Sequence, residues 1–118
     1  MSSRSLFRDD GDTRAFAPGE TIFVEGDDGG LMYVVLEGSV PLSVTGRTLE
    51  KVGKGGVFGE MALIDAAPRS ATATALTACT LVPVTAERFR SLVKESPDFA
   101  VEIMRVMAAR LRSMDRRL

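Results

Sequence analysis

The sequence predicts a mainly β protein that ends in two helices. Short apolar runs alternate with glycine-containing turns from residue 13 to residue 84, which is typical of a barrel, sandwich or roll. Two stretches with helical periodicity follow, at residues 86–95 and 97–117. The chain has 118 residues, enough for one domain with one core.

The first 12 residues are polar and predict a flexible N-terminal tail, which places the folded domain at residues 13–118. Residues 9–12 read Asp-Asp-Gly-Asp but lack the spacing and the terminal Glu of a calcium loop. The first strand that the pattern defines is Thr21–Val24, because Pro18-Gly19 and Gly26 frame it as turn signals.

Five further strands follow before the helices. Residues 32–36 form a continuous apolar run, as in a strand buried on both faces. Residues 40–44 alternate apolar and polar side chains, which predicts one inner and one outer face, and residues 48–52 follow after a turn. Residues 71–75 alternate small and β-branched side chains, and residues 79–84 give the last strand. Because proline cannot donate to a ladder, we expect Pro41 and Pro83 at an edge or a bulge.

Residues 58–72 hold a carboxylate and an arginine at a spacing that suits a particular ligand. Gly59 opens one or two predicted helical turns with Glu60 in the first turn, and the free N–H groups there can bond an oxyanion. Pro68 keeps the chain extended, Arg69 offers a planar fork for a phosphate, and Ser70 adds a hydroxyl. A carboxylate beside that phosphate needs a hydroxyl to accept from. A cyclic nucleotide has both a singly charged phosphate and a free ribose hydroxyl.

Phe58-Gly59-Glu60 with Pro68-Arg69-Ser70-Ala71-Thr72 resembles the phosphate-binding cassette of cyclic-nucleotide-binding domains. These occur in bacterial catabolite-activator-type regulators, cyclic-nucleotide-gated channels and cyclic-nucleotide-dependent kinases. The similarity extends to residues 18–27, to residues 33–38 and to the closing helices. It implies an antiparallel β-roll of jelly-roll type, with a short cassette helix and two C-terminal helices.

The resemblance also implies roles for individual residues. Arg69 and Ser70 are expected to bind the phosphate and Glu60 the ribose hydroxyl; the plain alternatives are an exposed strand arginine, a turn residue and a helix-terminal charge. Backbone N–H groups or close approach are expected from Gly59, Met61, Ala62 and Ala71. Met32, Val57 and Leu63 are either an apolar wall of the site or plain core. With Arg110, the expected ligand-binding set is Gly59, Glu60, Met61, Ala62, Arg69, Ser70, Ala71 and Arg110.

The last helix carries an arginine within its apolar stripe. At 100° per residue, the stripe comprises Phe99, Ile103, Val106, Met107, Met114 and Leu118, and Arg110 falls inside it. A charged head there calls for a partner or an exit to water. The resemblance implies that this helix is a mobile lid over the base and that Arg110 occupies a position used to cap a purine. Pairing or snorkelling at a helix contact, or a homodimer seam along the stripe, stays open.

Composition restricts the chemistry. The chain has no histidine and one cysteine, Cys79, which excludes zinc sites with His ligands, His-ligated haem, a Ser-His-Asp triad and an internal disulfide. We therefore expect no catalysis, metal or cofactor, and Cys79 is expected as a small buried hydrophobe. A net charge of −1 disfavours bulk nucleic-acid binding. No apolar run of about 20 residues or signal peptide is present, so the expected location is the cytoplasm.

We expect a cyclic nucleotide-binding regulatory module that signals by ligand-dependent closure of its C-terminal helix. Its partner would be another protein or a fused effector, and direct DNA binding is not expected because no recognition helix follows. The alternatives are an excised regulatory domain of a bacterial channel or kinase, and an interaction domain that binds no nucleotide. Ser70 is compatible with cAMP and with weak discrimination between cAMP and cGMP. We choose cAMP as the ligand, because the bacterial proteins that the chain resembles lean to cAMP.

Overall fold

The computed structural model describes residues 12–115. The predicted tail, apart from Asp12, and the end of the last helix beyond residue 115 lie outside this range. The elements are β1 (Arg14–Phe16), β2 (Thr21–Phe23), β3 (Leu31–Glu37), β4 (Val40–Val44), β5 (Arg47–Val52), β6 (Val57–Phe58), α2 (Glu60–Asp65), β7 (Thr72–Thr74), β8 (Cys79–Thr85), α3 (Ala86–Glu95) and α4 (Pro97–Asp115). The predicted mainly β fold with C-terminal helices is confirmed.

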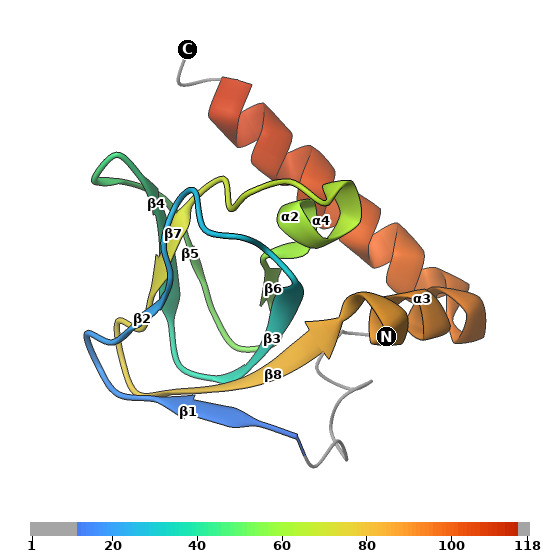
Figure 1. Cartoon of the computed structure of the whole chain (residues 1–118), viewed down its shortest axis with the longest axis horizontal. Helices are drawn as coiled ribbons and strands as arrows, with labels where there is room; N and C mark the ends of the chain where they lie inside the picture. The colour runs from blue at the N-terminus through green and yellow to red at the C-terminus, as the bar shows by residue number, and fades with distance from the viewer. Residues whose placement is uncertain (1–11, 116–118) are drawn as a thin grey trace.

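The strands form two four-stranded sheets, ordered β1-β8-β3-β6 and β2-β7-β4-β5. Every strand pair is antiparallel. The sheets close into a roll, and α2, α3 and α4 gather at one end of it, with α2 between the roll and α4 (Figure 1). The antiparallel β-roll that the sequence predicted is therefore confirmed.

β3 is buried on both faces, as its apolar run predicted. Tyr33 and Val35 face a cluster that lies between the two sheets, whereas Met32 and Val34 belong to a second cluster beneath the helices. The single predicted core is thus two clusters that share β3 as their wall. Val57 lies in the second cluster and Leu63 packs against it. All three therefore belong to the second core cluster or pack against it.

The two strand prolines lie in interior strands, but at positions where only one neighbour is paired. Pro83 of β8 pairs with Tyr33 of β3, while the pairing of β8 with β1 ends at Leu81. Pro41 of β4 pairs with β5, while the pairing with β7 begins at Leu42. Each proline therefore lies at a position that one neighbouring strand does not reach, because β1 and β7 have only three residues each.

The two C-terminal helices cover the second cluster. The Thr85 hydroxyl caps α3 by accepting from the Arg88 N–H at 3.1 Å. Phe99 and Ile103 of α4 are buried, and Val106 and Met107 pack beside them. This confirms the first part of the predicted apolar stripe. The structure does not describe the side chain of Met114 or residue 118. None of the described helices has the length and apolar character that a membrane span requires. Cys79 is buried and has a free thiol.

Candidate functional site

The structure brings all eight predicted site residues to the wall of one pocket. They come from α2, from the segment that leads into β7, and from α4. Five residues that the sequence did not single out complete the lining: Phe23, Leu42, Leu49, Glu50 and Ser113. The lining residues belong to β2, β4, β5, α2 and its flanking segments, and α4. α2 and α4 lie at the same end of the roll (Figure 1).

The cassette helix begins at a position that requires glycine. Gly59 has φ +84°, and a Cβ there would lie 2.8 Å from Nη1 of Arg69 and 3.2 Å from the Leu31 carbonyl oxygen. Glycine thus allows both the left-handed backbone and the close approach of Arg69. Because glycine has no side chain, no side-chain cap bonds the first N–H groups of α2.

Arg69 is buried, with 6% of its surface exposed, and its backbone is fixed on both sides. The Gly26 N–H donates to the Arg69 carbonyl at 2.9 Å, and the Arg69 N–H donates to the Asp27 carbonyl at 2.8 Å. The guanidinium donates to the carbonyl oxygens of Gly59 and Leu31 at 3.1 and 2.6 Å. It also lies over the ring of Phe23, 3.9 Å from its centre.

The charge of Arg69 is not neutralised by any side chain among residues 12–115. No carboxylate lies within ion-pair distance of it, and its buried Nε has no hydrogen-bond partner there. Desolvation by burial lowers the pKa of Arg69 below its ordinary value, and the charges of Tyr33, Asp27 and Glu60 act in the opposite direction. A buried, unpaired guanidinium that lines a pocket is suited to bind an anion there.

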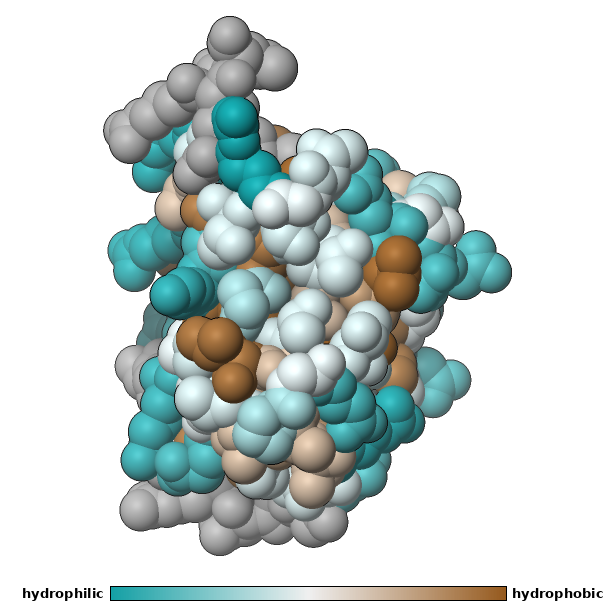
Figure 2. Space-filling view, turned by 90° about the vertical axis from the view of Figure 1, so that its left-hand side faces the viewer, coloured by the Kyte–Doolittle hydropathy of each residue, from teal (hydrophilic) through white to brown (hydrophobic). Residues whose placement is uncertain are grey.

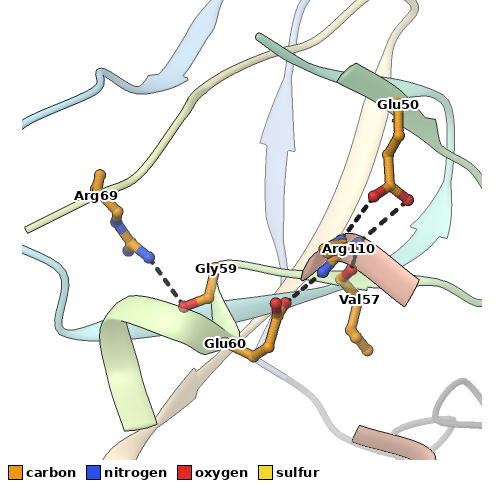
Figure 3. A network of polar contacts seen from close by, with 6 residues as sticks. All are labelled: Glu50, Val57, Gly59, Glu60, Arg69 and Arg110. Carbon is orange, nitrogen blue, oxygen red and sulfur yellow. Dashed lines mark hydrogen bonds and ion pairs between the residues drawn. The ribbon is translucent and has the colours of Figure 1, made fainter. Parts of the chain in front are cut away.

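Arg110 joins α4 to the cassette and to β5 through a network of four contacts (Figure 3). Its Nη1 donates to Oε1 of Glu60 at 2.5 Å, and its Nε donates to Oε1 of Glu50 at 2.7 Å. Its Nη2 donates to the Val57 carbonyl at 2.5 Å and, at 3.4 Å, to Oε2 of Glu50. Arg110 thus pairs with Glu60 of α2, as the alternative of pairing at a helix contact expects, and also with β5 and β6. Its role in capping a base stays a prediction.

The carboxylates of Glu50 and Glu60 stabilise the protonated form of Arg110. Burial alone would lower its pKa, but the hydrogen bond to Glu50 and the charge of Glu60 outweigh burial, so the pKa of Arg110 lies above its ordinary value. Glu60 itself is 1% exposed. Among the described residues only Arg110 donates to its side chain, through Oε1, which leaves Oε2 available to a hydroxyl.

Two residues that sequence reasoning missed are central to this geometry. Phe23 belongs to the segment 18–27 that carries the family resemblance, so a search for an aromatic partner of Arg69 could have found it. The sequence around Glu50 contains no motif that marks this residue as part of a site, because Glu50 lies within β5 among residues of no particular pattern. Its place beside Arg110 depends on a contact across 60 residues of sequence.

Among the described residues, no group of three or more Cys, Asp or Glu side chains could hold a metal ion. The face of the roll opposite the helices is largely hydrophilic, with apolar side chains in separate spots rather than in one patch (Figure 2).

A sequence model described as the cyclic nucleotide-binding domain matches residues 13–96. The CRP-like cAMP-activated global transcriptional regulator of Mycobacterium tuberculosis is 32% identical over 108 residues, which cover 87% of this chain and 48% of the regulator. The cyclic nucleotide-gated potassium channel of Mesorhizobium japonicum is 41% identical over 95 residues, which cover 80% of this chain and 26% of the channel. This chain thus spans about half of the regulator and about a quarter of the channel.

Solved structures show the same fold. The crystal structure of the Thermus thermophilus catabolite activator protein superposes with a TM-score of 0.78 at 36% sequence identity, over 88% of this chain and 51% of that chain. The family match ends at residue 96, so α4 and Arg110 lie beyond it.

Proposed function

Because the chain belongs to the cyclic nucleotide-binding domain family, we propose that it is a regulatory module that binds cAMP in the pocket lined by α2, Arg69 and α4. The module binds and signals, and no chemical step is assigned to it. Two of the similar proteins carry names that refer to cAMP or to cyclic nucleotides, which supports the ligand class. Assignment to cAMP rather than cGMP is part of the proposal.

The state of Arg69 is the observation that carries this proposal. Its guanidinium is buried, stacks on Phe23 and has an unused donor at Nε. Within the described chain it has no carboxylate partner, so a bound anion would supply the missing charge. The phosphodiester of a cyclic nucleotide carries a single negative charge, which matches the single positive charge of Arg69.

Glu60 supplies the second recognition element. A carboxylate repels a second anion but accepts strongly from a hydroxyl. With Oε1 held by Arg110 and Oε2 available, the side chain can accept from a ribose 2′-hydroxyl while its position stays fixed. A ligand that joins a phosphate to a ribose thus meets Arg69 and Glu60 with groups that suit each of them.

The signal would be carried by α4. This helix contacts the cassette through Arg110 and Glu60, so a ligand that binds the cassette changes the free energy of α4 docking. The output then reaches a protein partner or a fused effector. The genomic reading frame beyond codon 118 distinguishes a free-standing module from the regulatory domain of a longer protein such as a channel or a kinase.

Titration calorimetry with cAMP and cGMP tests the proposal. Arg69→Ala should weaken cAMP binding by about 2–5 kcal/mol, because a desolvated charge pair is lost, while the fold, measured by circular dichroism, persists. Arg69→Lys should not restore full affinity, since the planar fork is lost. Arg90→Ala, which removes an exposed arginine of α3, is the matched control and should bind like the wild type.

Two results would overturn the proposal. An affinity of Arg69→Ala within about threefold of the wild type, less than about 0.7 kcal/mol, would remove Arg69 from the phosphate site. No measurable heat with either nucleotide would instead favour an interaction domain that keeps the fold of the family without its ligand.

A further inference from the structure

We infer that Glu50 is a specificity-determining residue, whose carboxylate selects a purine with an amino group at position 6 over one with an oxygen there. Adenine has the amino group, whereas guanine and hypoxanthine have the oxygen. The inference rests on the proposed function, because it takes Arg69 as the phosphate contact and Glu60 as the ribose contact.

The order of the side chains along the pocket locates the base. Figure 3 shows Arg69 on one side, Glu60 in the middle, and Arg110 with Glu50 on the other side. The parts of a nucleotide follow the order phosphate, ribose and base. A phosphate at Arg69 and a ribose at Glu60 therefore place the base beside β5 and α4, where Glu50 lies.

The side chains at this end of the pocket offer a bound base mainly a hydrogen-bond acceptor, the carboxylate of Glu50. Arg110 already makes four hydrogen bonds, to Glu50, Glu60 and the Val57 carbonyl. The Glu50 side chain is 39% exposed. Among the described residues, its Oε2 receives only the long contact of 3.4 Å from Arg110. Ser113 also lines the pocket, but a hydroxyl donates and accepts and so does not discriminate.

An ionised carboxylate can only accept a hydrogen bond. The amino group at position 6 of adenine donates, so it can bond to Oε2 of Glu50. The oxygen at position 6 of guanine or hypoxanthine presents lone pairs instead, and these repel the carboxylate. Selection therefore comes from an attractive contact with one base and a repulsive contact with the other.

The test compares cAMP with two analogues that change position 6. Purine riboside 3′,5′-cyclic monophosphate has hydrogen in place of the amino group, and inosine 3′,5′-cyclic monophosphate has oxygen. Both should bind the wild-type protein at least about tenfold more weakly than cAMP, as expected for loss of a hydrogen bond to a charged group. In Glu50→Gln the preference for cAMP over the inosine nucleotide should fall below about threefold, because an amide can also donate to the oxygen.

The ratio of affinities is the readout, because loss of a partner for Arg110 would change the affinity for all the nucleotides alike. Glu95→Gln removes the same charge from an exposed site on α3 and should keep the wild-type ratio. Glu50→Gln is close in shape to the wild type, and its thermal unfolding checks that it folds.

Equal binding of cAMP and the two analogues to the wild type would overturn the inference and leave the proposed function intact. An unchanged ratio in Glu50→Gln would also overturn it, since another group would then read position 6. If no nucleotide binds the wild type, the proposed function itself fails.

Discussion

The two carboxylate oxygens of Glu60 differ in their contacts. Oε1 accepts from Arg110, and Oε2 has no donor among the described residues. If Oε2 accepts from the ribose 2′-hydroxyl, the 2′-deoxy analogue of cAMP should bind more weakly by about 1–3 kcal/mol. Calorimetry with the two ligands measures this difference.

Glu60→Ala provides the matching variant. Its affinities for cAMP and for the deoxy analogue should be equal within error, because the acceptor is gone. Equal binding of the two ligands to the wild type would assign Glu60 to holding Arg110 alone, with no part in ribose recognition.

The sequence predicted which residues belong to the candidate site better than it predicted their contacts. Arg69, Glu60 and Gly59 were predicted together because the cassette is continuous in sequence and each residue type has a distinct chemical use. That Arg69 is buried on Phe23 and that Arg110 pairs with Glu50 could not be predicted, since each contact joins segments that only the tertiary fold brings together.

At the scale of elements, α2 ends in an unfavourable backbone conformation. Its C-cap residue, Ala66, has φ 51° and ψ 35°, in the left-handed region that costs a non-glycine residue about 1–2 kcal/mol. Ala66→Gly should remove this strain. Glycine also loses more entropy on folding, by about 0.4–1 kcal/mol, so we expect a net stabilisation of about 0.5–1 kcal/mol, measured by urea unfolding.

The neighbouring alanine gives the control for this prediction. Ala67 has no positive φ, so Ala67→Gly gains no strain relief and should destabilise the protein. Equal effects of the two substitutions would show that the conformation of Ala66 carries no strain.

Elements were predictable where the local pattern was strong. The apolar run of β3 and the capping signals of α3 each define an element from adjacent residues. β1 and β6 were not singled out, because strands of three and two residues carry too little periodicity. They exist through pairing with β8 and β3, which is a long-range property.

At the scale of the whole molecule, Arg110 links α4 to Glu50 of β5 and to the Val57 carbonyl of β6. If α4 responds to ligand, its backbone amides from residue 98 to residue 115 should exchange more slowly with cAMP than without it. Arg110→Ala should speed exchange in α4 and weaken cAMP binding, because Glu60 loses the group that orients it. Hydrogen exchange read by mass spectrometry measures the first effect and calorimetry the second.

Arg105→Ala on the exposed side of the same helix is the control and should change neither quantity. Equal protection of α4 with and without cAMP, together with wild-type affinity in Arg110→Ala, would leave a static binding domain. A change in oligomeric state in Arg110→Ala would instead point to α4 as a dimer seam.

The position of Pro83 has a consequence for the solubility of the protein. Among residues 12–115, no strand pairs with the β1 flank of β8 beyond Leu81. An open flank of this kind is where a strand from another molecule could add and begin an aggregate. Intermolecular strand addition needs backbone N–H donors, and proline has none. Pro83 contributes no such donor to this stretch of β8, which disfavours strand addition there.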